Sequence, residues 1–328
     1  MTGPTMDLVK ATTRPGTYYQ PSSPEMSLSF CFSIILLIST LSTQSTALAQ
    51  TTFFTPKVVS APAFARAVNK LYIAGGITTG SSVLSQFISL DLTIPWNSSA
   101  PAWTKLANGP DEYNFPMAFS SDEQTLFTFH IGGTNSPLQY NVQNNTWQKS
   151  TALFQNTNKD GIGAVTDPRT GLIYLAGGYN ELKWNSPPTL YMDVFDPVSQ
   201  TIHTEVVPDS GKALLVQQGY GNVWSKYRNV ILYWGGEPWD LKEVRALKQE
   251  QNDVIEFKPD SRTWNAMPLT ISDASTPDQT AMKSAPVSTW GHCMAANEDG
   301  TKAIIYGGSL WNNSVVGDLW IVDVDRIV

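Results

Sequence analysis

The sequence predicts an all-β protein made of repeated four-stranded antiparallel sheets. Three observations lead to this fold class: a composition low in charge and rich in aromatic residues, an apolar strand ending in Gly-Gly that recurs five times, and polar hairpin turns at the same place in each copy. Charged residues make up 15% of the 328 residues and aromatic residues 11%. Because average soluble proteins carry about 25% charged residues, this composition favours sheets whose surfaces use Ser, Thr, Asn and Gln.

The same composition excludes several classes of protein. A disordered chain would have fewer aromatic residues and more charge. A formal net charge of -7 argues against a nucleic-acid binder, which needs a basic surface. Two cysteines are too few for a disulfide scaffold.

The first fifty residues are predicted to lie outside the fold. Residues 1–25 show no hydrophobic period, and we interpret them as an unstructured extension or a mis-called start. Residues 26–50 are predicted to be a secretory signal, because an apolar run from Phe30 to Leu41 precedes the small-residue pattern Ala47-Leu48-Ala49. A membrane anchor is the alternative, although a spanning helix needs about 20 apolar residues. We therefore expect a secreted or cell-surface protein.

Two further expectations follow from the secretory route. Cleavage after Ala49 or Gln50 would leave Cys293 as the remaining cysteine, so no internal disulfide is expected. Three Asn-x-Ser/Thr tripeptides predict glycosylation at Asn97, Asn144 and Asn312.

The repeat begins with five apolar strands that end in Gly-Gly, at 71–76, 126–133, 172–178, 230–236 and 303–308. A strand-like stretch and a polar turn precede each one, which predicts a hairpin. A loop of variable length and an alternating strand follow each one, at 86–92, 138–142, 190–197, 253–259 and 318–324. A turn and a Trp come next in three copies, at Trp103, Trp147 and Trp264; the third copy has Ile202-His203 there, and the fifth ends first.

This pattern resembles the kelch repeat over about residues 60–328. The resemblance implies a kelch-like β-propeller, a fold relative of the galactose oxidase propeller, with five recognisable blades of four antiparallel strands. We name the strands of each blade A to D from the axis outward. Stacking such sheets radially would bury both faces of each one, and the Trp of the outer strand would fill space between neighbours. Five coincidental hairpins in a β-sandwich are the alternative.

The fifth copy lacks strand D, which leaves the number of blades open. Residues 51–60 form a spare strand-like stretch before the first blade, and we expect them to supply the missing outer strand. The propeller would then span residues 51–328 and have five blades. The alternative is a propeller truncated from six or more blades, in which a C-terminal membrane anchor could also be missing.

Long loops are predicted on one face of the propeller, where the B–C and D–A connections meet. They cover residues 77–86, 107–116, 179–188, 237–252 and 268–289. Because loops on a rigid scaffold often carry function, we expect this face to bind an extracellular protein or a glycan. The candidate binding residues are Trp184, Trp239, Trp311, Tyr113, Tyr179, Asp111, Glu181 and Asp240. Packing of these Trp side chains beneath their own loops is the alternative, and residues 241–252 could form a short helix.

Catalysis is the rival function. Copper enzymes of the galactose oxidase type use Tyr and His ligands, but His130, His203 and His292 fall on strands at different radii, so no metal or other cofactor is predicted. The sequence also lacks the common hydrolase and phosphate-binding motifs, so no catalytic residue is assigned. A carbohydrate-active enzyme would need two acids at a separation that the sequence does not define.

Overall fold

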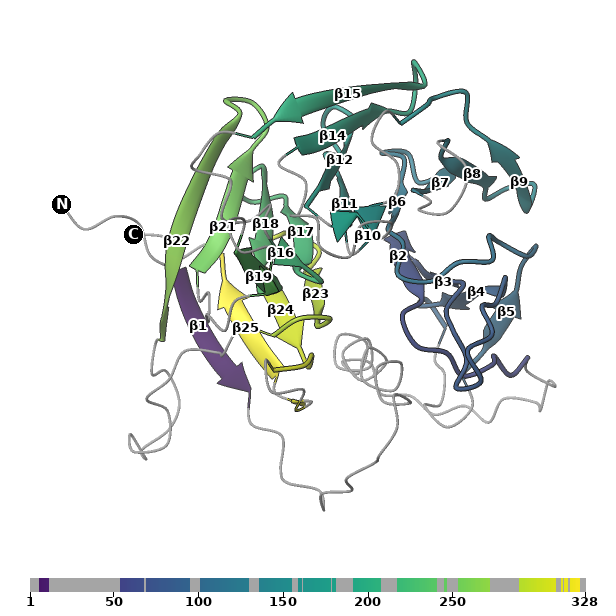
Figure 1. Ribbon diagram of the computed structural model, residues 1–328, viewed down its shortest axis with the longest axis horizontal. Coiled ribbons are helices and arrows are strands. Elements are labelled where there is room, and N and C mark those ends of the chain that lie inside the picture. Colours follow the sequence, from purple (N-terminus) through teal and green to yellow (C-terminus); the bar gives the residue numbers. More distant parts are fainter. Residues whose placement is uncertain are drawn as a thin grey trace. The chain divides into compact units, whose positions relative to one another are not determined.

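The computed structural model describes residues 6–11, 54–67, 69–94, 101–129, 136–154, 159–160, 162–177, 179–180, 191–207, 217–240, 245–246, 253–271, 289–310, 314, 316–317 and 319–324. The chain divides into two compact units (Figure 1). The blade 1–2 unit comprises Tyr19–Gln155, and the blade 3–5 unit comprises Met1–Tyr18 together with Asn156–Val328.

The blade 1–2 unit contains two four-stranded antiparallel sheets. Blade 1 has the order β2-β3-β4-β5, from β2 (Ala63–Ala67), β3 (Lys70–Ala74), β4 (Phe87–Asp91) and β5 (Trp103–Lys105). Blade 2 has the order β6-β7-β8-β9, from β6 (Met117–Phe119), β7 (Thr125–Thr128), β8 (Leu138–Asn141) and β9 (Thr146–Lys149). The innermost strands β2 and β6 lie next to each other, as neighbouring blades require.

The blade 3–5 unit contains the other three blades (Figure 1). Blade 3 consists of β11 (Gly163–Thr166), β12 (Ile173–Ala176), β14 (Tyr191–Asp196) and β15 (Thr201–Val206). Blade 4 consists of β17 (Gly221–Ser225), β18 (Val230–Trp234), β21 (Asp253–Lys258) and β22 (Thr263–Ile271). Blade 5 begins with β23 (Cys293–Ala296), β24 (Lys302–Tyr306) and β25 (Leu319–Asp323), and β11, β17 and β23 are successive neighbours. The predicted all-β fold, a β-propeller with five blades of four antiparallel strands, is confirmed.

The outer strand of blade 5 comes from the N-terminal end of the chain, but not from the predicted residues. Strand β1 (Met6–Ala11) pairs antiparallel with β25, from Asp7 opposite Asp323 to Ala11 opposite Leu319. β1 therefore lies where the sequence predicted an extension without structure. Residues 54–60, which include most of the segment expected to fill this position, form no strand, and Ser60 instead makes an isolated bridge with Ile77 in blade 1.

Cys293 also differs from expectation. The side chain at the start of β23 is disulfide-bonded in the full chain, whereas the prediction of an unpaired cysteine concerned the chain cleaved after Ala49 or Gln50.

The double glycines bring successive blades together. The amide of Gly76 donates a hydrogen bond of 2.8 Å to the carbonyl of Glu112, and the amide of Gly236 makes the equivalent bond of 2.9 Å to Thr289. Gly75 has a φ of 68°, and a Cβ atom there would collide with the carbonyl oxygen of Glu112. Glycine is needed here because any side chain would collide with backbone of the next blade.

Apolar side chains fill the seams between blades. One buried cluster joins blades 1 and 2, a second joins blades 3 and 4, and a third joins blades 4 and 5. Blades 3 and 4 are also linked by Arg169, whose guanidinium lies 2.8 Å from the carboxylate of Asp167 and 2.8 Å from that of Asp260. Among the described residues, no helix is long and apolar enough to cross a membrane.

Candidate functional site

The loops on the predicted binding face contain ordered β-structure in blades 3 and 4. Strands β10 (Lys159–Asp160) and β13 (Tyr179–Asn180) form a two-stranded sheet above blade 3. Strands β16 (Gln217–Gln218), β19 (Glu237–Asp240) and β20 (Arg245–Ala246) form a three-stranded sheet beside blade 4. We call these two sheets the accessory sheets. Each accessory sheet joins the D–A loop that leads into a blade to the B–C loop of that same blade. This pairing restrains both loops.

Three predicted binding residues belong to the accessory sheets. Tyr179 lies opposite Asp160 in β13, while Trp239 and Asp240 lie opposite Ala246 and Arg245. The short helix expected within 241–252 is wrong at 245–246, because these residues form β20. Pairing with β19 therefore outweighs the local helical preference of this charged segment.

Hydrogen bonds between blades place these loops on one side of the blade 3–5 unit. The hydroxyl of Tyr220, just before β17, donates to the carbonyl of Ala176 at the end of β12 and accepts from the amide of Gly163 at 3.2 Å. The amide of Gly291, just before β23, donates to the carbonyl of Gly219 at 2.7 Å. The starts of the inner strands in blades 3, 4 and 5 therefore share one side, and burial raises the pKa of the Tyr220 phenol.

The other predicted site residues are more dispersed. Asp111 is exposed and Tyr113 is half-buried on the loop between β5 and β6, so both belong to the blade 1–2 unit. The glycosylation candidate Asn144 is exposed in the turn between β8 and β9. Trp184, Trp311, Glu181, Asn97 and Asn312 lie outside the described residues. Tyr179, Trp239 and Asp240 thus belong to the same unit, Tyr179 in the accessory sheet of blade 3 and the other two in that of blade 4.

The histidines that prompted the copper question have separate roles. His292 is buried between blades 4 and 5, where its Nε2 accepts from the amide of Gly221 at 3.1 Å and its Nδ1 lies 2.9 Å from the carbonyl of Thr289. Burial lowers the pKa of His292 to about 4, so the ring is neutral at physiological pH. His203 lies on the outer strand β15, and His130 lies outside the described residues. Within the described ranges, no group of three or more His, Cys, Asp or Glu side chains could hold a metal ion.

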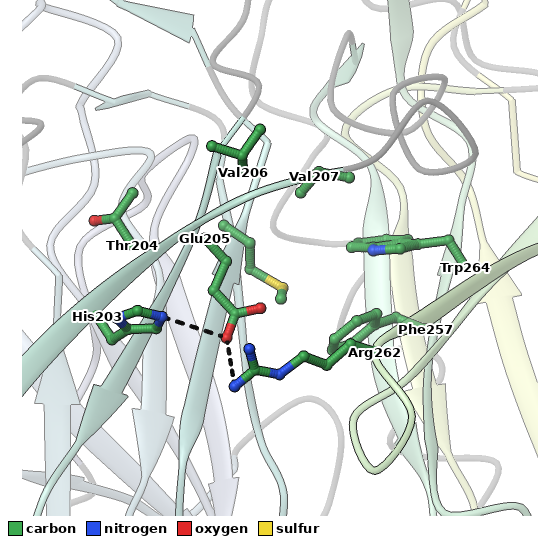
Figure 2. A pocket seen from close by; sticks show the side chains of 9 residues that line it. His203, Thr204, Glu205, Val206, Val207, Phe257, Arg262 and Trp264 are labelled. Atoms are coloured by element: carbon green, nitrogen blue, oxygen red, sulfur yellow. Dashed lines mark ion pairs between the residues drawn. The ribbon is translucent and has the colours of Figure 1, made fainter.

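A second candidate site, which was not predicted from the sequence, is a pocket of about 330 Å³ between blades 3 and 4 (Figure 2). We call it the seam pocket. Its apolar walls come from buried side chains, and its charged groups come from β15 and from the turn before β22. The lining residues are Met192, His203, Thr204, Glu205, Val206, Val207, Phe257, Arg262 and Trp264.

Glu205 is the central charged group of the seam pocket. Its Oε1 lies 3.2 Å from Nη2 of Arg262 and 3.7 Å from Nε2 of His203. The Glu205 side chain is 16% exposed, whereas those of Arg262 and His203 are 68% and 69% exposed. A half-buried carboxylate is therefore held at the pocket wall by two groups that lie mostly in water. The sequence signal for this site was the interruption of the Trp pattern at Ile202-His203.

Comparisons with known proteins address the fold. No protein-family model matches the chain, and no curated protein matches it. The solved structure of YjhT is similar with a TM-score of 0.54 and 16% sequence identity, over 78% of this chain and 74% of that chain. A likeness at this identity bears on the fold alone, and because 530 chains of solved structures match, it selects no single activity. The chain is therefore similar to known β-propellers.

Proposed function

We propose that this protein is a secreted or cell-surface interaction module of the kelch type, which binds an extracellular protein or a glycan through its long-loop face. The observation that carries the proposal is the pair of accessory sheets. They hold the backbone of Tyr179, Trp239 and Asp240 on one side of the blade 3–5 unit.

Physical arguments support binding at this place. A rigid scaffold that restrains its loops lowers the entropy lost when a partner binds. Aromatic residues are enriched at protein interfaces, and an acid beside them can accept hydrogen bonds from hydroxyl or amide groups of a ligand. The predicted secretory signal supports an extracellular partner. Sequencing the N-terminus of the protein recovered from culture medium tests that route. A first residue of 50 or 51 would support the secretory signal and would mean that the mature protein lacks β1, whereas a retained Met1 would keep the pairing of β1 with β25.

The experiment is a binding screen of the full chain against arrays of glycans and of purified extracellular proteins. The strongest hits are then measured again with Trp239→Ala and Tyr179→Ala. The matched control is Tyr227→Ala, because Tyr227 is 57% exposed in the turn between β17 and β18, at the opposite end of these strands.

We expect binding to weaken about tenfold or more in the two loop variants, since interface aromatics often dominate affinity. The control should bind like the parent. Equal binding by Trp239→Ala, Tyr179→Ala and the parent chain would contradict the proposal, provided that all of them melt at the same temperature.

A further inference from the structure

The seam pocket exists because residues that close another seam are replaced here. In blades 1 and 2, Trp147 packs on Phe87 with ring centroids 5.0 Å apart and donates through Nε1 to the carbonyl of Ala107 at 3.1 Å. Asn145 accepts from the amide of Ala107 at 2.8 Å and from the hydroxyl of Tyr140 at 2.9 Å. Aromatic packing and one side-chain amide thus close the seam between blades 1 and 2.

Strand register identifies the equivalent positions in blades 3 and 4. Trp147 pairs with Tyr140, and Trp264 pairs with Phe257. The Tyr140 hydroxyl, which donates a hydrogen bond to Asn145, therefore has no counterpart at Phe257. Asn145 and Arg262 each lie two residues before the Trp, and both have a φ of 53°.

The other wall of the seam shows the same exchange. The backbone amide of Leu106 donates a hydrogen bond to the carbonyl of Phe87, so these two residues lie opposite each other in blade 1. In blade 3 the opposite pair at this position is Glu205 and Met192, with Glu205 in place of Leu106 and Met192 in place of Phe87. The closed seam therefore has Phe, Leu and Asn where the seam pocket has Met192, Glu205 and Arg262.

The chemistry of the pocket favours a ligand with a donor head on an apolar stem. Among the described residues, the contacts of Glu205 with Arg262 and His203 are both made by Oε1, and Figure 2 shows the second carboxylate oxygen on the side turned away from His203. A carboxylate oxygen only accepts hydrogen bonds, so the ligand must donate. Met192, Val207, Phe257 and Trp264 are all buried and give the pocket apolar walls.

The strand beside the pocket offers a way to present such a head. β15 has six residues and lies at the edge of the sheet that the structure describes for blade 3. An edge strand leaves backbone amide and carbonyl groups open to an added strand. Blade 4 shows that an outer strand of this unit takes an additional strand, since β22 pairs in parallel with β1 from Met6 opposite Leu269.

We propose that the seam pocket binds a lysine or arginine side chain, which a partner protein presents from an extended segment paired with β15. The aliphatic stem packs against Met192 and Trp264, and the cationic head donates to Glu205. The cationic head displaces Arg262 from Glu205 at little cost, because an ion pair with a mostly exposed guanidinium contributes little to stability. The net charge of -7 favours approach of a basic partner. This second surface does not depend on the long-loop face.

The test uses three labelled octapeptides with the common frame Ser-Val-Thr-x-Thr-Val-Ser-Gly, where x is lysine, norleucine or glutamate. Fluorescence anisotropy measures their binding to the full chain and to Glu205→Gln. The matched control is Glu298→Gln, because Glu298 is an exposed acid in the turn between β23 and β24. A lysine peptide with N-methylated backbone amides tests the pairing with β15.

We expect the lysine peptide to bind about tenfold or more tightly than the norleucine and glutamate peptides, because a hydrogen bond between charged groups is at stake. Glu205→Gln should remove this preference, Glu298→Gln should keep it, and backbone methylation should abolish binding. Equal affinity for the lysine and norleucine peptides, no binding of the lysine peptide, or an unchanged preference in Glu205→Gln would overturn the proposal. Full binding of the methylated peptide would overturn the pairing with β15.

Discussion

The seam between blades 1 and 2 and the seam between blades 3 and 4 share the same strand register, but the first is packed and the second contains a cavity with charged residues beside it. In the first, Trp147, Phe87 and Asn145 fill the space and pair its polar groups. In the second, Glu205 and Arg262, which stand at the positions of Leu106 and Asn145, lie beside a cavity of about 330 Å³. A repeat can therefore keep its strand register while a few substitutions turn a packed seam into a space large enough for a ligand.

The open seam is held together at other points. Arg169 joins Asp167 in blade 3 to Asp260 in blade 4, and the rings of Tyr174 and Phe257 lie 5.6 Å apart. The blades therefore stay in contact around the pocket, which lets the pocket exist without separating them.

The largest expected effect is in the closed seam. Trp147→Ala removes ring contacts with Phe87 and Tyr140 and the hydrogen bond to Ala107. Because Trp147 is partly buried, we expect its loss to cost about 3 kcal/mol or slightly more of unfolding free energy, at the lower end of the range for a core Trp. Urea unfolding of the full chain checks this value. A loss below about 1 kcal/mol would mean that the seam relaxes around the vacancy and is not held by this residue.

The seam between blades 4 and 5 should respond to pH. Because the pKa of His292 is lowered from 6.5 to about 4 in the folded state, the unfolded chain binds the extra proton between these values. His292 therefore contributes its full stability above pH 6.5 and loses it as the pH falls toward 4, by about 3 kcal/mol in all.

Urea unfolding near neutral pH and at about pH 4.5 measures this loss, with His292→Gln as the comparison. The difference between parent and variant isolates His292 from the carboxylates that also titrate in this range. Parallel stability curves for the two proteins would show that the histidine ring is not the responsive group.

A smaller effect is expected from the ionic link across the open seam. Arg169→Ala leaves the carboxylate of Asp167, which is fully buried, without its cationic partner. We expect a loss of about 2 kcal/mol, reduced from the value for fully buried pairs because Arg169 is 33% exposed. Thermal unfolding measures the loss. The control is Arg262→Ala, which breaks the more exposed ion pair between Arg262 and Glu205. An equal loss of stability in both variants would contradict the role of Arg169 in linking blades 3 and 4.

The repeated parts of the fold were predictable from the sequence because they repeat. An apolar strand followed by Gly-Gly recurs five times, although at unequal intervals, and the backbone contact of Gly76 with Glu112 explains why the glycines are needed. β1 was not predictable in this way, because it has no hydrophobic period and pairs with β25 near the other end of the chain. The pairing depends on an empty edge in blade 5, which only the assembled sheet defines.

The binding role of Tyr179, Trp239 and Asp240 stays a prediction. The sequence placed these residues on loops and did not indicate the accessory sheets, because strands of two residues such as β13 and β20 are too short to show a periodicity. The seam pocket was missed because Glu205 and Arg262 are 57 positions apart, and their meeting depends on how two blades pack. The one local signal was a missing Trp at Ile202-His203.

The most direct measurement on the two seams is the behaviour of a chain in which the open seam is given the residues of the closed one. The double variant Glu205→Leu, Arg262→Asn copies Leu106 and Asn145 into blades 3 and 4. We expect the lysine octapeptide to lose its binding while the melting temperature changes by only a few degrees, since an ion pair with a mostly exposed guanidinium contributes little to stability. Undiminished peptide binding, or loss of binding only together with unfolding, would contradict the account.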